Sequence, residues 1–226
     1  MYKPPRALLF DFDGVVVNSK AVHFNAWRSA FKVLFEKEIA DFPVKLTGKS
    51  PMQIAEYFAK TGGNASLAEK LYFLKDEHLV TNDDLPELLP GVVALQKWAG
   101  TFQIPYGIAS NATRQFLKKS ITGLSLSFPV YLGFEDYEKP KPDPEAYRKL
   151  ANRLDVSTKD LKDCWVFEDS MVGLKAAKEA GMFTIGVLTQ YSEDIMLEAG
   201  ADLVFPTCKE AFLYIKKHSG YHLDMI

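Results

Sequence analysis

Residues 8–15 read Leu-Leu-Phe-Asp-Phe-Asp-Gly-Val, and this stretch decides how the rest of the chain is interpreted. A short apolar run ends in two aspartates, Asp11 and Asp13, and a glycine follows them. In an extended chain, side chains two residues apart point to the same side, so the two carboxylates would lie together. Their repulsion would be offset by a hard cation such as Mg²⁺, or by a proton on one carboxyl group. Alternatively, Asp11 caps a helix and Asp13 belongs to a turn.

Similar apolar runs recur along the chain and predict six buried strands. Odd and even positions of these runs are both apolar, as expected of strands in a parallel sheet that is covered on two faces. The runs are 7–10, 104–109, 129–132, 165–167, 184–188 and 203–205. Helical patterns separate most of them, at 91–98, 113–120, 143–154 and 170–180. This alternation predicts an α/β fold with a doubly wound, Rossmann-like parallel sheet.

One long segment departs from the alternation. Residues 18–88 contain no convincing strand, and three parts of this segment, 19–37, 51–60 and 66–79, have helical patterns. We therefore expect a core domain formed by residues 1–17 and 89–226, and an all-helical domain inserted at 18–88. An insertion after the first strand lies at the carboxyl end of that strand, where folds of this class bind ligands. The insertion is thus expected to act as a lid, or cap.

The composition excludes several classes of protein. At 47% hydrophobic and 25% charged residues, the 226-residue chain is ordinary globular material and neither disordered nor fibrous. Lys and Arg number 27 against 29 Asp and Glu, a net charge of −2, so neither nucleic acid nor a membrane surface is an expected partner. No apolar run suits a membrane span or a signal peptide. We expect a cytoplasmic protein.

Polar residues also follow the second predicted strand, and two lysines lie in a later loop. Ser110 and Asn111 come directly before a helix, where a hydroxyl group and backbone amides bind anions. The alternative is simple capping by Asn111 or Thr113. Further along, residues 138–144 read Glu-Lys-Pro-Lys-Pro-Asp-Pro, in which the prolines keep the chain extended and fix the direction of Lys139. Lys139 would then bridge phosphate and carboxylates, unless both lysines of this segment are solvated.

Two acids end the fourth predicted strand. Glu168 and Asp169 precede Ser170, which is the simple N-cap of the next helix, so the acids are not needed as caps. A metal site shared with Asp11 and Asp13 would explain their position. Alternatively, they are solvated acids that the helix dipole favours. Taken together, the four segments place acid pairs, a hydroxyl group and a lysine where such folds bind ligands.

In this order the four motifs resemble those of the haloacid dehalogenase superfamily, and the helical insertion resembles its α-helical cap. The branch that fits is that of β-phosphoglucomutase and phosphoglycolate phosphatase. The resemblance implies that Asp11 is a nucleophile that forms an aspartyl phosphate. It also implies that Asp13 is the general acid and base, whereas the dehalogenases of the superfamily typically lack this aspartate.

The same resemblance implies the binding roles. Phosphate would be held by Ser110, Asn111 and Lys139. Mg²⁺ would be bound by Asp11, the backbone carbonyl of Asp13, and Asp169, with Glu168 as an indirect or water-mediated metal partner.

The insertion bears on the substrate. The resemblance places His23 and Lys49 near the mouth of the site. Pro51 stands where the mutase has an arginine for a second phosphate group, and proline cannot replace it, which favours hydrolysis. We therefore expect a Mg²⁺-dependent phosphatase, monomeric or weakly dimeric, that acts on a small phosphorylated metabolite such as a sugar phosphate or phosphoglycolate. The alternatives are a phosphohexomutase and a catalytically silent domain that binds phosphosugars.

Overall fold

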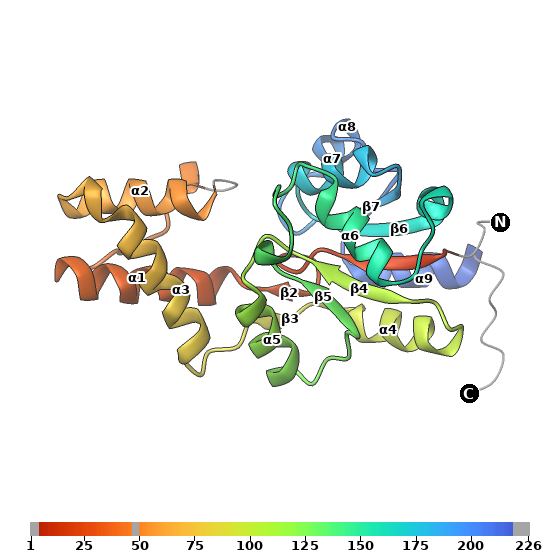
Figure 1. Cartoon of the computed structure of the whole chain (residues 1–226), viewed down its shortest axis with the longest axis horizontal. Helices are drawn as coiled ribbons and strands as arrows, with labels where there is room; N and C mark the ends of the chain where they lie inside the picture. Colours follow the sequence, from red (N-terminus) through yellow and green to blue (C-terminus); the bar gives the residue numbers. More distant parts are fainter. Residues whose placement is uncertain (1–4, 47–49, 219–226) are drawn as a thin grey trace. The chain divides into compact units, whose positions relative to one another are not determined.

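The computed structural model describes residues 5–46 and 50–218 (Figure 1). The chain divides into two compact units. The larger unit consists of Met1–Asn18 and Glu87–Ile226, and the smaller unit is the segment Ser19–Pro86 between them.

The larger unit is built on a six-stranded parallel sheet in the order β5-β4-β1-β6-β7-β8 (Figure 1). The strands are β1 (Ala7–Phe10), β4 (Tyr106–Ala109), β5 (Val130–Leu132), β6 (Cys164–Glu168), β7 (Phe183–Val187) and β8 (Leu203–Phe205). Each predicted strand is present, with boundaries that move by one or two residues at most. The predicted doubly wound α/β fold is therefore confirmed.

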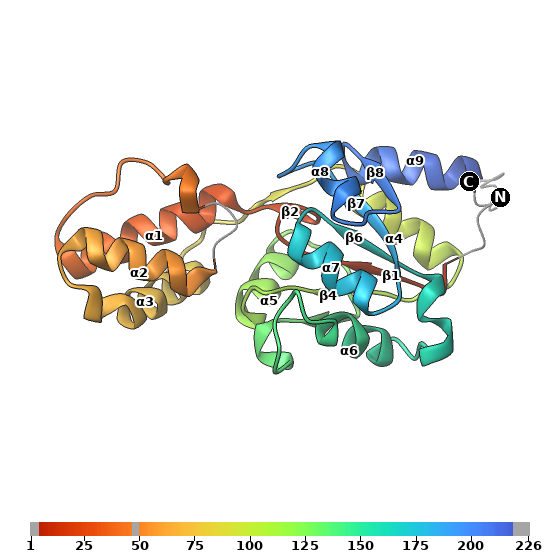
Figure 2. The ribbon, with the colours of Figure 1, turned by 90° about the horizontal axis from the view of Figure 1, so that it is seen from above.

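Helices cover both faces of this sheet (Figures 1 and 2). One face carries α6 (Glu145–Arg153), α7 (Met171–Glu179) and α8 (Glu193–Glu198), and the other carries α4 (Val92–Thr101) and α9 (Cys208–His218). Helix α5 (Arg114–Gly123) packs beside the edge strand β5. Short 3-10 turns, at Phe134–Asp136 and Thr158–Asp163, complete the connections.

Alternation along the central strands determines what faces α6 and α7. Leu9 of β1 and Val166 of β6 belong to one buried cluster, together with Tyr147 and Leu150 of α6. Since side chains in a strand alternate between faces, the residue two positions after Leu9 or Val166 points to the same side. At both positions that residue is an acid, Asp11 just after β1 and Glu168 at the end of β6, so each acid is directed toward α6 and α7.

Within its described residues, the smaller unit contains helices joined by loops and no strand. It contains α1 (Lys20–Phe35), α2 (Pro51–Gly62) and α3 (Ala68–Thr81), with 3-10 turns at Val44–Leu46 and Ala65–Leu67. Its core is a cluster of large apolar side chains that includes Trp27, Phe31, Phe58 and Leu71. The apolar spacing along the first helix therefore reflects packing inside this unit.

Two very short strands lie where the smaller unit leaves and rejoins the larger one. β2 (Val17–Asn18) pairs antiparallel with β3 (Glu87–Leu88), and Asn18 lies opposite Glu87. The sequence predicted no strand anywhere in 18–88, because two residues are too few to leave a periodic pattern. This pairing brings the two ends of the inserted segment together.

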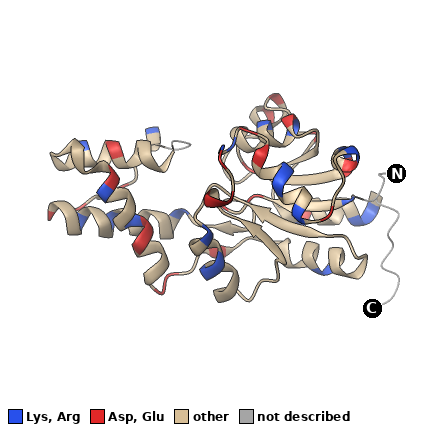
Figure 3. Ribbon diagram, viewed as in Figure 1, with Lys and Arg blue, Asp and Glu red and all other residues tan. Residues whose placement is uncertain are grey.

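Charge is balanced locally as well as in total. Figure 3 shows basic and acidic residues interspersed over both units, in line with the net charge of −2. Among the described residues, no helix is long and apolar enough to cross a membrane.

Candidate active site

The strand order brings the predicted motifs to one edge of the sheet. β1 is central and ends just before Asp11, β4 on one side ends before Ser110, and β6 on the other side ends at Glu168 with Asp169 next. All three strands are parallel, so their carboxyl ends meet at the same edge. Beside β1 the direction of the strand order also reverses, since β4 and β5 lie on one side of it and β6, β7 and β8 on the other, and this position is the usual ligand site of doubly wound folds.

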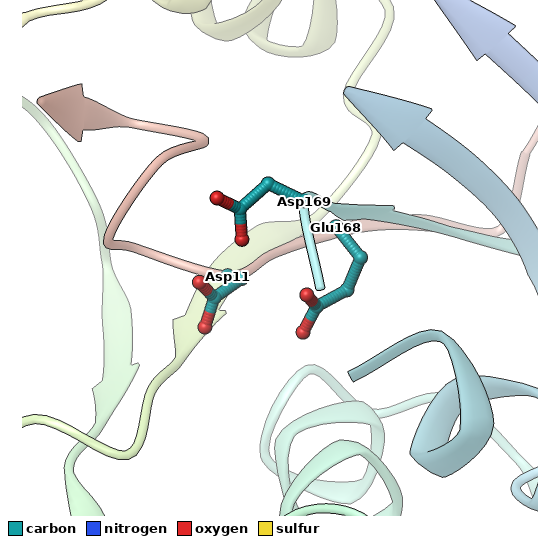
Figure 4. A group of neighbouring side chains, drawn as sticks. All are labelled: Asp11, Glu168 and Asp169. Carbon is teal, nitrogen blue, oxygen red and sulfur yellow. The ribbon is translucent and has the colours of Figure 1, made fainter. Parts of the chain in front are cut away.

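Three acids form a compact buried group at this edge. Asp11, Glu168 and Asp169 each offer a carboxylate oxygen, and these oxygens lie within 4.8 Å of one another (Figure 4). Burial raises the pKa of Asp11 well above its ordinary value, against the opposing effect of Lys141. Burial, followed by the charge of Glu168, raises the pKa of Asp169 to about 7. A crowded set of oxygen donors with excess negative charge fits a hard divalent cation such as Mg²⁺. Asp13 is half-buried and is not part of this group.

A buried lysine neutralises part of this charge. The Nζ atom of Lys141 lies 2.6 Å from Oδ1 of Asp11 and 2.6 Å from Oε1 of Glu168. Burial acts to lower the pKa of Lys141, but the two carboxylates outweigh burial and raise it. Lys141 therefore stays positively charged beside the predicted nucleophile.

This geometry corrects the prediction for Lys139. The side chain of Lys139 is 71% exposed, and its Nζ atom lies 4.0 Å from Asp143. The loop is held by Glu145, at the start of α6, whose carboxylate accepts hydrogen bonds from the backbone N–H groups of Glu138 and Lys139. The alternating Lys-Pro-Lys-Pro pattern treats the two lysines alike, so the sequence alone did not identify Lys141 as the one directed inward.

The Glu168 carboxylate accepts hydrogen bonds from three residues, whereas the sequence predicted only an indirect contact with a metal ion. Its Oε1 atom accepts hydrogen bonds from Lys141 and from the Tyr147 hydroxyl, each at 2.6 Å. Its Oε2 atom accepts from the backbone N–H of Ser170 at 3.3 Å and from the Ser170 hydroxyl at 2.9 Å. A Cβ atom on Gly173 would lie 1.8 Å from Oε1, so the glycine leaves the space that this carboxylate fills. Ser170 also caps α7, as predicted.

The loop after β4 is fixed by hydrogen bonds of Ser110, Thr113 and Tyr137. Ser110 is buried, and its hydroxyl oxygen accepts a hydrogen bond from the backbone N–H two residues on, at 3.1 Å. Helix α5 is capped instead by Thr113, which accepts a backbone N–H at 3.4 Å. The hydroxyl group of Tyr137 contacts the Ser110 carbonyl oxygen and the Asn111 side chain. Capping therefore accounts for Thr113 and leaves Ser110 and Asn111 available as predicted phosphate ligands.

A threonine joins the first motif to the fourth. The Thr189 hydroxyl lies 2.6 Å from the Gly14 carbonyl oxygen and 3.1 Å from Oδ2 of Asp169. Gly14 has a φ of +84°, and a Cβ atom there would lie 1.9 Å from the Asp169 carboxylate. The glycine is therefore needed both for its backbone conformation and for the close approach of Asp169. No motif around Thr189 could have revealed this contact.

The predicted substrate residues of the insertion belong to the smaller unit. His23 is half-buried in the first turn of α1. Lys49 lies outside the described residues. Pro51 is the first residue of α2, where the preceding Ser50 forms a capping box with Gln53. These assignments stay predictions.

Comparison with known proteins identifies the family. A sequence profile of the haloacid dehalogenase-like hydrolases matches residues 8–187, which span the sheet from β1 to the end of β7. The chain belongs to this family. The predicted superfamily is thereby confirmed.

Individual relatives include both phosphatases and mutases. The β-phosphoglucomutase of Bacillus subtilis is 30% identical over 192 residues, which cover 80% of this chain and 83% of that protein. Validoxylamine A 7'-phosphate phosphatase of Streptomyces hygroscopicus subsp. limoneus is 27% identical, with 88% of this chain and 92% of the relative covered. The β-phosphoglucomutase structure from Clostridium difficile shares the fold, with a TM-score of 0.73 at 24% identity over 94% of this chain and 96% of that one. The predicted branch and the predicted enzyme class, a phosphoric monoester hydrolase, are confirmed.

Proposed function

We propose that this hydrolase is a Mg²⁺-dependent phosphatase of small organic phosphate monoesters, such as a sugar phosphate or a phosphoglycolate-like compound. The observation that carries the proposal is the position of Asp11. Asp11 directly follows the central strand, and its carboxylate lies 2.6 Å from the Lys141 ammonium group, within the acid group that includes Asp169. An acid so placed can attack phosphorus while its neighbours offset the charge of the phosphoryl group.

The reaction has two displacements. In the first, an Asp11 oxygen forms a bond to phosphorus, the bond from phosphorus to the ester oxygen breaks, and Asp13 gives its proton to the departing alcohol. In the second, Asp13 takes a proton from a water molecule, the water oxygen bonds to phosphorus, and the aspartyl–phosphate bond breaks. Inorganic phosphate and free Asp11 result.

The remaining residues hold and neutralise the transferring group. Lys141 takes the role that the sequence gave to Lys139, and Ser110 and Asn111 donate hydrogen bonds from the end of β4. The cation would be held by Asp11, Asp169 and Glu168, with the Asp13 carbonyl oxygen as a further ligand. Bound Mg²⁺ supplies positive charge that reduces the repulsion between phosphate and carboxylates.

A phosphohexomutase is the second candidate, because a β-phosphoglucomutase is among the relatives. The two functions differ in whether water or a sugar hydroxyl group attacks the aspartyl phosphate. Pro51 favours hydrolysis, because it begins α2 where the mutase is expected to have an arginine. A phosphosugar-binding domain without activity would need neither Asp13 nor its proton.

The test is phosphate release from a panel of phosphate esters, with Mg²⁺ or with a chelator, by the wild type, Asp11→Asn and Asp194→Asn. Asp194 is an exposed aspartate in α8 and serves as the matched control. We expect metal-dependent release that falls by roughly 10³-fold or more in Asp11→Asn and is unchanged in Asp194→Asn. β-Glucose 1-phosphate in the same panel, with detection of glucose 6-phosphate, identifies a mutase. Folded protein that converts no ester contradicts the proposal.

A further inference from the structure

Tyr147 lies at the centre of the buried charges, although no motif singled it out. It belongs to α6, its side chain is fully buried, and its hydroxyl oxygen lies 2.8 Å from the Lys141 Nζ atom and 2.6 Å from Oε1 of Glu168. We propose that Tyr147 is a positioning residue, whose hydroxyl group fixes the Lys141 ammonium group in contact with Asp11. This inference rests on the proposed function.

Counting donors shows why the hydroxyl group matters. A lysine ammonium group has three N–H donors and no acceptor. Lys141 uses them on Asp11 Oδ1 at 2.6 Å, Glu168 Oε1 at 2.6 Å and the Tyr147 hydroxyl at 2.8 Å. Glu168 Oε1 and the Tyr147 oxygen lie 2.6 Å from each other, so this pair and Asp11 together restrict where the ammonium group lies. Without the Tyr147 hydroxyl group, only the two carboxylates hold the ammonium group.

The hydroxyl group is used in both directions. Its oxygen accepts from Lys141, and its hydrogen is donated to Glu168, because a carboxylate only accepts and an ammonium group only donates. The Lys141 Nζ atom also lies 4.5 Å from the centre of the Tyr147 ring. Phenylalanine at 147 would keep the ring contact and lose only the hydroxyl group, so this substitution isolates the feature that the proposal invokes.

The tyrosine is the rigid partner in this contact, and the lysine is the flexible one. The Tyr147 ring is packed in the core cluster with Ala146, Leu150 and Val166. Lys141 carries its charge on a flexible four-carbon chain, which has several rotatable bonds. The packed ring therefore determines where the Lys141 ammonium group lies. In this way Tyr147 acts on Asp11 indirectly, through the contact between Lys141 and Asp11.

The kinetic test compares Tyr147→Phe with Thr184→Val. Thr184 also has a fully buried, hydrogen-bonded hydroxyl group, which contacts Gly200 and Asp202 near the amino end of β7, so its loss is the matched control. We expect Tyr147→Phe to lower kcat by about 10-fold or more with KM within about threefold, because the lysine contact strengthens in the transition state. Inhibition by orthovanadate should weaken by a similar factor. Thr184→Val should lower Tm and leave kcat and KM as in the wild type.

A second measurement is independent of turnover. In protein with ¹⁵N-labelled lysine side chains, the Lys141 ammonium signal, assigned by its loss in Lys141→Met, should be sharp and protected from solvent in the wild type. It should broaden in Tyr147→Phe and return when 3-fluorotyrosine, which keeps the hydroxyl group, replaces Tyr147. If Tyr147→Phe does not fold, the wild-type signal decides, and a broad, solvent-exchanging Lys141 signal overturns the inference.

The outcomes separate this inference from the proposed function. If the wild type converts no ester, the proposed function fails, and the lysine signal alone decides whether Tyr147 fixes Lys141. If the wild type is active and Tyr147→Phe matches it in kcat and in the lysine signal, the inference is overturned while the proposed function stands. If Tyr147→Phe loses only Tm, as Thr184→Val does, Tyr147 is structural and the inference is also overturned.

Discussion

A buried carboxylate such as Asp11 keeps its charge only if its neighbours replace the water that burial removes. One lysine, Lys141, lies between Asp11 and Glu168, at 2.6 Å from each, and Asp169 adds a third acid to the group. With all three acids ionised, the described site therefore carries more negative than positive charge. This imbalance is the physical reason to expect a cation there, and it makes the loss of Lys141 costly, because two buried acids share this lysine.

The two lysines of the Lys-Pro-Lys-Pro segment form a natural matched pair. We expect Lys141→Met to lower kcat/KM by roughly 10²–10³-fold, because the charge beside the transferring phosphoryl group is lost. It should also lower the free energy of unfolding by about 3 kcal/mol, because two buried acids lose their counter-ion. Lys139→Met should leave both quantities unchanged, since its side chain is 71% exposed. Equal effects of the two substitutions, in ester hydrolysis and urea titration, would reverse the assignment made from the structure.

The start of helix α7 is shaped by its contact with the Glu168 carboxylate. Ser170 caps the helix and also donates to Glu168, so the helix start and the acid are fixed together. Gly173 lies in the first turn and leaves the space for the Glu168 carboxylate. Glycine normally weakens a helix, so its presence here reflects the space that the acid requires.

Glycine-to-alanine substitutions in two helices test this explanation. Gly173→Ala should lower the free energy of unfolding by about 2 kcal/mol and reduce kcat, because its Cβ atom would lie 1.8 Å from the Glu168 carboxylate. Gly100→Ala in α4 has no atom within 4 Å of the new Cβ and should raise stability by about 0.5–1 kcal/mol. Thermal unfolding and ester hydrolysis check both. A stable, fully active Gly173→Ala protein would show that Glu168 does not need this space.

The sequence predicted the strands well because buried parallel strands leave continuous apolar runs, and it predicted Asp11, Ser110 and Asp169 as residues at the ends of such runs. It did not identify the contacts that depend on distant parts of the chain. Lys141 reaches Asp11 across 130 positions, and Thr189 reaches Gly14 across 175. No local pattern records such contacts, since they follow from which strands become neighbours.

At the scale of the whole molecule, the chain consists of a sheet unit interrupted by a helical unit. Each has its own buried cluster, and the larger unit contains all six strands of the parallel sheet together with the acid group. The interruption begins and ends at the β2–β3 pair, where Asn18 lies opposite Glu87. The larger unit can therefore be closed without the smaller one by a tight turn.

We expect a protein in which Asn-Gly replaces Ser19–Pro86 to fold. Asn-Gly favours the two-residue hairpin turn that joins directly paired antiparallel residues, whereas Pro-Pro does not and serves as the control. Circular dichroism should show a mixed α/β spectrum and a single cooperative thermal transition for the Asn-Gly protein, with a lower Tm for the Pro-Pro protein. Failure of the Asn-Gly protein to fold would mean that the sheet unit depends on the helical unit.

The contact between Thr189 and Gly14 has a consequence for the order of events during synthesis. The ribosome makes Gly14 early and Thr189 late, so Asp169 and the first loop are not held together until most of the chain has been translated. A nascent chain that carries Asp11 therefore lacks the arrangement that would make this aspartate reactive. The contact that joins Asp169 to the first loop is therefore complete only after residue 189 has been added to the chain.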